Sequence, residues 1–223
     1  MMTTMMTTMT AATKTPARDV SEPVTSSDWR RSLPVLLGQK VVLRELRLSD
    51  APSLLSMLTT EEVTRFISPP PTTVEGFELF ITATLRQQAA GVHACFAVTL
   101  PGDDVAIGIF QVRQLSQGFE TAEWGFAIGS PFWGTGVFAD AATLVLDFVF
   151  DTLGVRRLEA RVVVQNGRGN GAIAKMGAVQ EGLLRQSFDR SGRIYDQLLY
   201  SILDEDWRLT RNRPRDLPRG LVH

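Results

Sequence analysis

Hydrophobic and polar residues follow two kinds of pattern between about residues 33 and 207. Runs that alternate, or that are rich in β-branched residues, predict strands. These runs cover residues 41–48, 95–100, 105–113, 121–129, 158–165, 180–188 and 193–203. Apolar residues at helical spacing predict helices that begin after Asp50, after Thr72 and at Val137, and a fourth, short helix is expected after Asn166.

Polar residues and glycines mark where several elements begin or bend. Asp50 is placed to cap the first helix, and Thr72 with Glu75 fits a capping box that opens the second. Gly125 lies inside a strand pattern, where a glycine indicates a bulge or a close approach of the backbone. Gly177 follows the short helix, as a C-terminal cap does.

The order of the elements predicts an α+β fold. A single strand–helix–strand unit lies between strands that follow one another through short turns. We therefore expect a mixed, mostly antiparallel twisted sheet of about six to seven strands flanked by helices, in one domain of residues 33–207. Residues 1–32, rich in Thr and Met, and residues 208–223, rich in Arg, show no such pattern and are predicted to be disordered tails.

Composition excludes several classes of protein. The 223 residues carry a formal net charge of −1, so the chain lacks the overall positive field typical of a nucleic-acid-binding protein. The single cysteine, Cys95, cannot form an internal disulfide, and two histidines do not make a histidine-rich metal site, so no metal is expected. There is no signal-peptide core and no run of about 18 apolar residues, which predicts a cytoplasmic protein without a membrane span.

The stretch that begins at Gly134 gives the first indication of chemistry. A strand ends, Gly134 and Gly136 follow, and a helix begins at once, which is an arrangement that binds phosphate groups. A tight turn that needs positive φ explains the same glycines. Gly134–Ala139 also matches the dinucleotide fingerprint G-x-G-x-x-A, with Glu159 as its acidic partner, which would make the chain an NAD(P)-dependent oxidoreductase. We disfavour this alternative, because that fingerprint joins the first strand of a repeated βαβ fold directly to its helix.

Three linked stretches carry a more specific signal. They are AEWGFAIGSPFWGTGVFADA at 122–141, NGRGNGAIAKMGAVQEGLLR at 166–185 and DQLLYSILDEDW at 196–207. In this order they resemble the GNAT superfamily of acetyl-CoA-dependent N-acetyltransferases, and within it the RimJ/RimL-type branch. The resemblance covers about residues 38–207. The positions that match the branch are Asn166, Lys175, Gly177, Glu181, Gly182, Arg185, Asp196, Tyr200, Ser201, Ile202, Leu203 and Trp207.

The resemblance implies a site for acetyl-CoA between two strands that part, one before the glycine loop and one after its helix. Amides of the loop would hold the pyrophosphate, and Asn166 would bind the pantetheine arm. Arg168 and Lys175 could contact the 3′-phosphate, although both are also explained as solvated helix charges. A backbone N–H near residues 126–128 would polarise the thioester carbonyl. The implied cofactor-binding residues are Phe126, Ala127, Ile128, Trp133, Gly134, Thr135, Gly136, Val137, Asn166, Gly169 and Lys175.

The implied reaction is direct attack of a primary amine on the thioester. A base must take a proton from the amine, because a protonated amine cannot attack. The resemblance gives this role to Glu123, whose other interpretation is a partner for an arginine. Tyr195 is the candidate acid for the leaving thiolate, with Tyr200 as a second, although both are also explained as packed strand aromatics.

The sequence departs from the family pattern at three positions. Gly169 stands where the branch has Ser, Ile173 where many members have Tyr, and Pro131 where the superfamily often has Gln or Arg. The missing Ser and Tyr leave open a second alternative, a non-catalytic module that binds acyl-CoA. The missing Gln or Arg removes a side chain from the pyrophosphate site but leaves the amides of the loop.

The acceptor is expected to be a protein N-terminus or a small-molecule amine. Its contacts are predicted on the segment Phe66–Thr84 and on the last hairpin, and the protein is expected to be a monomer or a homodimer. His93 precedes a predicted strand and is interpreted as a surface residue. Cys95 begins that strand and is interpreted as a small buried hydrophobe.

Overall fold

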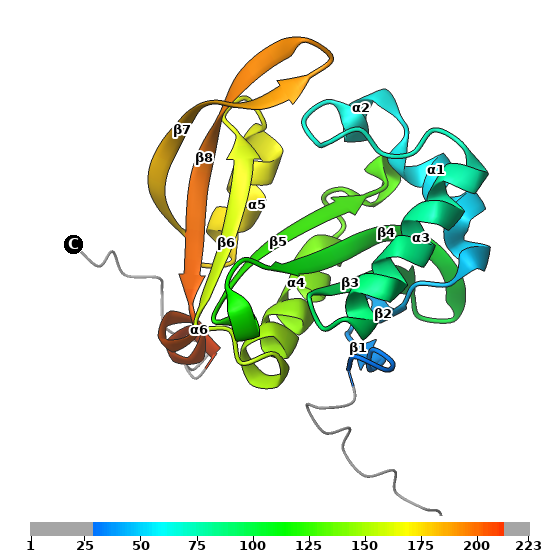
Figure 1. Ribbon diagram of the computed structural model, residues 1–223, viewed down its shortest axis with the longest axis horizontal. Coiled ribbons are helices and arrows are strands. Elements are labelled where there is room, and N and C mark those ends of the chain that lie inside the picture. The colour runs from blue at the N-terminus through cyan, green and yellow to red at the C-terminus, as the bar shows by residue number, and fades with distance from the viewer. Residues whose placement is uncertain (1–28, 212–223) are drawn as a thin grey trace, which may run out of the picture.

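The computed structural model describes residues 29–211, which form one twisted sheet with helices on both faces (Figure 1). The described part contains eight strands, one more than the upper end of the expected range. The additional strand has two residues, too few to produce a pattern in the sequence. The strands are β1 (Leu36–Leu37), β2 (Val42–Glu45), β3 (His93–Leu100), β4 (Asp103–Gln114), β5 (Thr121–Ile128), β6 (Arg157–Val163), β7 (Val179–Arg190) and β8 (Arg193–Leu203).

The strands lie in the order β1-β2-β3-β4-β5-β6-β8-β7. Every neighbouring pair is antiparallel except β5 and β6, which are parallel. The predicted mixed, mostly antiparallel sheet is therefore confirmed. The crossover between the two parallel strands contains the helix that follows the glycine loop, as the strand–helix–strand pattern predicted.

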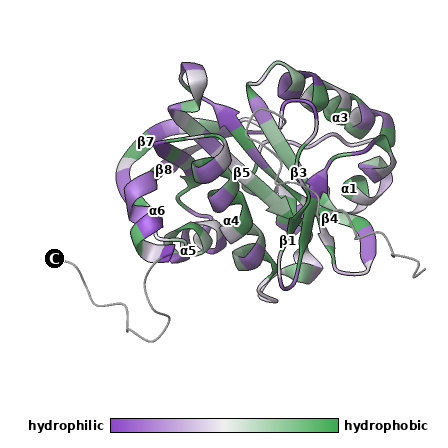
Figure 2. Cartoon of the chain, turned by 90° about the horizontal axis from the view of Figure 1, so that it is seen from below, coloured by the Kyte–Doolittle hydropathy of each residue, from purple (hydrophilic) through white to green (hydrophobic). Residues whose placement is uncertain are grey.

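The helices pack on opposite faces of this sheet. They are α1 (Ala51–Leu58), α2 (Glu61–Thr64), α3 (Val74–Ala89), α4 (Val137–Asp147), α5 (Gly167–Lys175) and α6 (Asp204–Arg211). A π-helical turn, Phe148–Thr152, continues α4. Figure 2 shows hydrophobic residues along the strands inside the molecule and mostly hydrophilic residues on α6.

Alternate residues of the central strands build two hydrophobic cores. On one face, Phe96 and Phe110 pack with Val145 and other residues of α4 in the larger core. On the other face, Cys95 and Ile109 pack with residues of α1 and α3 in the smaller core. Cys95 is thus a buried hydrophobe, as predicted. On this face α1 and α3 pack mainly against β3 and β4, and α1 also contacts β5, whose Ala127 packs against the smaller core.

Three local predictions need correction. Asp50 precedes α1, but its carboxylate does not cap α1 and instead binds Arg44 and the backbone N–H of Arg47, at the start of the short 3-10 helix Leu48–Asp50. The helix α3 is capped by Thr73, whose side chain accepts from the N–H of Gly76, and not by Thr72. The pairing of β4 with β5 runs through Gly125 in regular register, so no bulge lies there.

The described residues extend beyond both predicted edges of the domain. Trp29 is 5% exposed and its ring meets Phe119 edge to face at 5.7 Å, so the core begins before residue 33. At the other end α6 continues to Arg211, which binds Asp147 and Asp151. The rest of both predicted tails lies outside the described residues. Within residues 29–211, no helix is long and apolar enough to cross a membrane.

The ion pair between Arg44 and Asp50 should be a main determinant of stability. Two nitrogens of the Arg44 guanidinium donate to the two Asp50 oxygens at 2.8 Å each, and both side chains are almost fully buried. Removing Asp50 leaves the buried Arg44 guanidinium with only the exposed Asp104 as a counter-charge. We therefore expect Asp50→Asn to lower the free energy of unfolding by about 3 kcal/mol, measured by urea denaturation.

Asp104→Asn is the matched control. Asp104 also binds the Arg44 guanidinium, but its side chain is 64% exposed, so water replaces most of the lost interaction. We expect a much smaller loss of stability than for Asp50→Asn. Equal effects of the two substitutions would contradict the importance given to burial.

Candidate active site

A gap opens in the sheet where β5 and β6 part. The two strands pair only from Thr121 to Glu123, opposite Arg157 to Glu159. Beyond that point β5 stays paired with β4 as far as Ile128, and β6 stays paired with β8 to its end. The two strands therefore diverge, as the resemblance implied, and the gap lies between their free edges.

The glycine loop closes the end of this gap at the start of α4. Gly134 and Gly136 have φ of 77° and 90°, a left-handed conformation that favours glycine, so the tight-turn explanation of these glycines is correct for their backbone. The indole Nε1 of Trp133 donates to the carbonyl of Ile128 at 2.8 Å, which ties the loop to the end of β5. The N-terminal N–H groups of α4 begin directly after Gly136.

The backbone of β5 directs polar groups into the gap. The N–H of Gly129 donates to Ile107 on the β4 side at 2.8 Å. Because N–H groups alternate along a strand, those of Phe126 and Ile128 point to the opposite side, toward the gap, whereas that of Ala127 faces β4. Among the residues predicted to polarise a carbonyl, the alternation therefore favours Phe126 and Ile128.

Asn166 and Gly169 lie at the start of α5, on the other side of the gap. The side chain of Asn166 caps α5, accepting from the N–H of Gly169 at 2.9 Å. A Cβ atom at residue 169 would lie 2.6 Å from the Asn166 amide nitrogen, so the observed position of the Asn166 side chain needs the glycine. Ile173 is buried in the larger core, so α5 offers no acid at that position.

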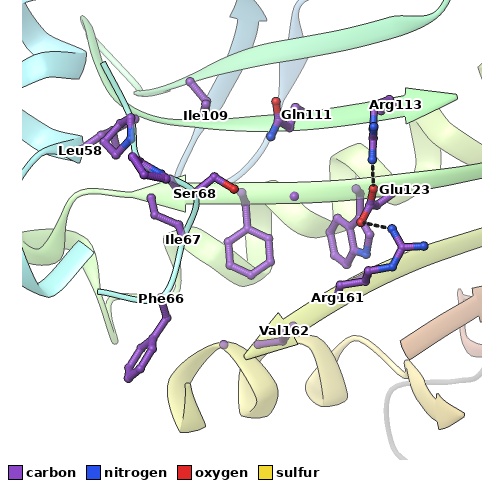
Figure 3. Close-up of a pocket in the computed structure, with 18 of the residues that line it drawn as sticks. Leu58, Phe66, Ile67, Ser68, Ile109, Gln111, Arg113, Glu123, Arg161 and Val162 are labelled. Carbon is purple, nitrogen blue, oxygen red and sulfur yellow. Dashed lines mark hydrogen bonds and ion pairs between the residues drawn. The ribbon is translucent and has the colours of Figure 1, made fainter. Parts of the chain in front are cut away.

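A cavity of about 820 Å³ joins the gap to the open face of β4, β5 and β6. Its residues come mainly from the segment Phe66–Thr84, from β4, β5 and β6, from α5 and from the last hairpin, and a few come from α1, α3 and β3. Figure 3 shows Phe66, Ile67 and Ser68 across the cavity from the strands. The predicted site residues that line it are Glu123, Phe126, Ala127, Asn166 and Gly169.

Glu123 lies on the floor of this cavity between two arginines (Figure 3). One carboxylate oxygen accepts from Arg113 of β4, and the other accepts from Arg161 of β6 at 2.9 Å. The side chain of Glu123 is 18% exposed. The interpretation of Glu123 as an arginine partner is therefore correct, and the pairing holds the carboxylate where β5 and β6 part.

The row of charges continues across the sheet. Arg157 binds both Glu159 and Glu181, and the Ser201 hydroxyl donates to Glu181 at 2.6 Å. The hydrogen bond from Arg157, and to a smaller extent the one from Ser201, lowers the pKa of the Glu181 carboxyl to about 2. Glu159 Oε2 also lies 3.5 Å from a guanidinium nitrogen of Arg161. Glu159 therefore pairs with arginines in the middle of β6, and not at a strand end, where the acidic partner of a dinucleotide would lie.

His93 is not the surface residue that the sequence predicted. It begins β3, is 7% exposed and lines the cavity, with a ring nitrogen, Nδ1, that has no hydrogen-bond partner. Burial lowers the pKa of His93 below its usual value, and the charge of Arg113 lowers it further, against a hydrogen bond with Gln111 that raises it. The imidazole is therefore neutral at neutral pH.

Ile128 and residues 133–137 of the glycine loop are not part of the cavity wall, and neither are Tyr195, Tyr200 and Lys175. Tyr195 packs against Phe66 and Phe188, each with ring centroids 6.4 Å apart. Tyr200 is buried in the larger core, and burial raises the pKa of its hydroxyl. Lys175 lies in the exposed last turn of α5.

Some residues of the site could not be recognised from the sequence. Gln111, Arg113 and Arg161 line the cavity only because β4, β5 and β6 are neighbours. Arg168 of α5 was singled out in the sequence for the 3′-phosphate, but its stacking on the Trp133 ring, 4.5 Å from the ring centroid, which links the two sides of the gap, was not predicted. Within residues 29–211, no cluster of His, Cys, Asp and Glu is arranged to hold a metal ion.

The chain belongs to the GNAT acetyltransferase family. The family model described as "Acetyltransferase (GNAT) domain" matches residues 40–179, which is more than half of the chain. The uncharacterized N-acetyltransferase YoaA of Bacillus subtilis is 29% identical over 175 residues, which cover 76% of this chain and 97% of YoaA. The protein is therefore an N-acetyltransferase, and the resemblance to GNAT enzymes is confirmed.

Two further relatives bear on the branch. The [ribosomal protein uS5]-alanine N-acetyltransferase of Escherichia coli is 24% identical over 113 residues, 50% of this chain and 58% of that protein. Mycobacterium smegmatis RimJ, solved in complex with CoA-disulfide, has the same fold, with a TM-score of 0.71 and 21% identity over 77% of this chain and 88% of that one. The predicted likeness to the RimJ/RimL-type branch is confirmed.

The buried His93 should make stability depend on pH. The unfolded chain binds a proton at this residue near pH 6.5, whereas the folded protein binds it only at lower pH. Stability is therefore lost as the pH falls below about 6.5. We expect His93→Gln to lose less free energy of unfolding than the wild type between pH 7.5 and 5.5, measured by urea denaturation at each pH.

An identical pH dependence in His93→Gln and the wild type would contradict the assignment of a neutral, buried imidazole.

Proposed function

We propose that this protein transfers the acetyl group of acetyl-CoA to a primary amine by direct attack on the thioester. The observation that supports this function best is the gap between β5 and β6, with the glycine loop and the start of α4 at its end. Neither a free strand edge nor a glycine loop is specific alone. Their combination, inside the segment that matches the GNAT domain, favours a ligand with a long polar arm and a phosphate group.

The residues on both sides of the gap fit acetyl-CoA. The pyrophosphate would lie on the N–H groups of residues 134–137, and the pantetheine arm would lie along the free edge of β5. The thioester carbonyl would accept from the N–H of Phe126 or Ile128, which stabilises the negative charge that develops on this oxygen. The thioester would then face the cavity in which Glu123 lies.

In the reaction, the nitrogen of the neutral amine forms a bond to the thioester carbon and the carbon–sulfur bond breaks. The leaving thiolate has a pKa of about 8.5 and can depart without an acid. Acetyl transfer therefore does not need Tyr195 as an acid, and Tyr195 does not line the cavity. The proton lost by the amine goes to Glu123, directly or through water, and the two arginines keep the carboxylate in place for this step.

The charges of the cavity restrict the acceptor. Its charged lining residues within the described chain are Arg113, Arg161 and Glu123, two cations and one anion. The wall opposite is made of aromatic residues and Pro69–Pro71. A polycation would be repelled, whereas a single amine on an uncharged or acidic molecule fits, and a protein N-terminus is such an amine. The name of the E. coli relative, which specifies a ribosomal protein, supports the same class.

Ligand-dependent thermal melting tests the choice of cofactor. At 100 times its dissociation constant, a ligand stabilises the folded protein by about 2.7 kcal/mol, which raises the melting temperature by a few degrees. We expect this shift with acetyl-CoA and with CoA, and none with NADPH. A shift with NADPH alone would contradict the proposal.

Glu123→Gln tests the proposed base. The variant keeps the shape of the side chain but cannot accept the proton, so the rate of acetyl transfer should fall by roughly 10²–10⁴-fold with the affinity for CoA unchanged. Release of CoA thiol, with peptides and small amines as acceptors, measures the rate.

Glu159→Gln is the matched control for this variant. Glu159 is the register partner of Glu123 on β6 and also pairs with arginines, but it does not line the cavity. Its substitution should leave the rate close to that of the wild type. Equal losses in the two variants would point to the ion pairs, and not to proton transfer, as the role of Glu123.

A further inference from the structure

Lys40 connects the turn between β1 and β2 with the glycine loop, 95 residues later. Its Nζ donates to the carbonyl oxygen of Thr135 at 2.6 Å, and its backbone N–H donates to Asp140 Oδ2 at 2.6 Å. The N–H of Val41 donates to the same oxygen at 3.2 Å. Asp140, in the first turn of α4, thus fixes the turn that carries Lys40, and Lys40 holds the loop from which α4 begins.

The hydrogen bond to Thr135 fixes the direction of the next amide. In a trans peptide the C=O of one residue and the N–H of the next point in opposite directions, and the described residues contain no cis peptide. Because the Thr135 carbonyl faces the ammonium, the N–H of Gly136 points away from Lys40. A Cβ atom at residue 136 would lie 2.9 Å from the Lys40 Nζ, so the glycine allows this close approach.

Lys40 also brings a full positive charge to the loop. The loop itself offers amides and the start of a helix, which carry only partial charges. Pro131 has no side-chain donor at the position where the superfamily often has Gln or Arg. The Lys40 ammonium lies against the loop from a distant part of the chain, and a pyrophosphate, which is anionic, is stabilised by such a charge.

We propose that Lys40 is a positioning residue for the pyrophosphate of acetyl-CoA. It holds the Thr135–Gly136 peptide with its N–H turned outward, and it supplies a positive charge that the side chains of the loop lack. This inference rests on the proposed function, from which it takes the ligand of the loop. Lys40 affects the affinity for the cofactor and does not affect the rate of the acetyl-transfer step.

Titration calorimetry with CoA tests this role in Lys40→Met, Lys40→Arg and the wild type, each at low and high salt. We expect Lys40→Met to raise the dissociation constant of CoA roughly tenfold and to weaken its dependence on salt. Lys40→Arg, which keeps the charge and a donor, should recover most of the affinity. Arg86→Met removes an equal charge from an exposed position on α3 and should bind CoA as the wild type does.

Kinetics with a truncated donor separate positioning from damage to the fold. Lys40→Met should raise KM for acetyl-CoA at nearly constant kcat, and it should use S-acetylpantetheine, which has no pyrophosphate, as well as the wild type does. Melting temperatures of the ligand-free variants show whether they are folded, and Lys40→Gln replaces Lys40→Met if that variant is not.

Two results overturn the role of Lys40 alone. One is an unchanged dissociation constant of CoA in Lys40→Met, and the other is an equal loss with acetyl-CoA and S-acetylpantetheine. A wild type that binds no CoA overturns the proposed function, and the role of Lys40 with it. The two failures are therefore distinguishable in the same titration series.

Discussion

The short parallel pairing of β5 with β6 is the constraint on which the site depends. Three residues of each strand pair before the strands part, and beyond them the edge of β5 faces the gap. Buried backbone polar groups need hydrogen-bond partners, so a gap of this kind favours a ligand that carries amides along its length. Aromatic packing holds β5 in place on one side of the gap. Phe126 of β5 packs against Phe138 of α4, with 4.6 Å between the ring centroids, so β5 stays against the crossover helix. On the other side of the gap, β6 stays paired with β8.

The uneven cover of the sheet decides where an acceptor can enter. The helix α4 covers one face, whereas on the other face α1 and α3 pack mainly against β3 and β4, with a smaller contact of α1 with β5. Arg113, Glu123 and Arg161 form a row of paired charged side chains on the part of this face that stays open. The same uncovered surface becomes the floor of the cavity. The proposed reaction thus joins a ligand inside the sheet to an amine that arrives from one face.

Local patterns predicted the elements well, but they did not predict contacts between distant segments. The helical spacing of apolar residues correctly predicted α1 and α4, and Gly134 and Gly136 have the positive φ that a tight turn requires. Asp50 was expected to cap α1, but its carboxylate accepts hydrogen bonds from Arg44 of β2 instead. His93 was expected on the surface, because its burial comes from β4 and α3, which pack against it only in the folded sheet. Lys40 carries no local signal at all, since its partner is 95 residues away.

Several residues that carry the family resemblance stabilise the last hairpin and take no part in the proposed chemistry. Glu181 binds Arg157 and Ser201, and the Trp207 indole donates to Asp147 at 3.0 Å. These bonds hold β7, β8 and α6 around the strand that forms one side of the gap. Because the pKa of Glu181 is about 2, this end of the charge row stays ionised throughout the range in which an acceptor amine titrates. A protein N-terminus has a pKa near 8, so a rise of the transfer rate between pH 7 and 9 would follow deprotonation of the acceptor itself rather than a change in this part of the protein.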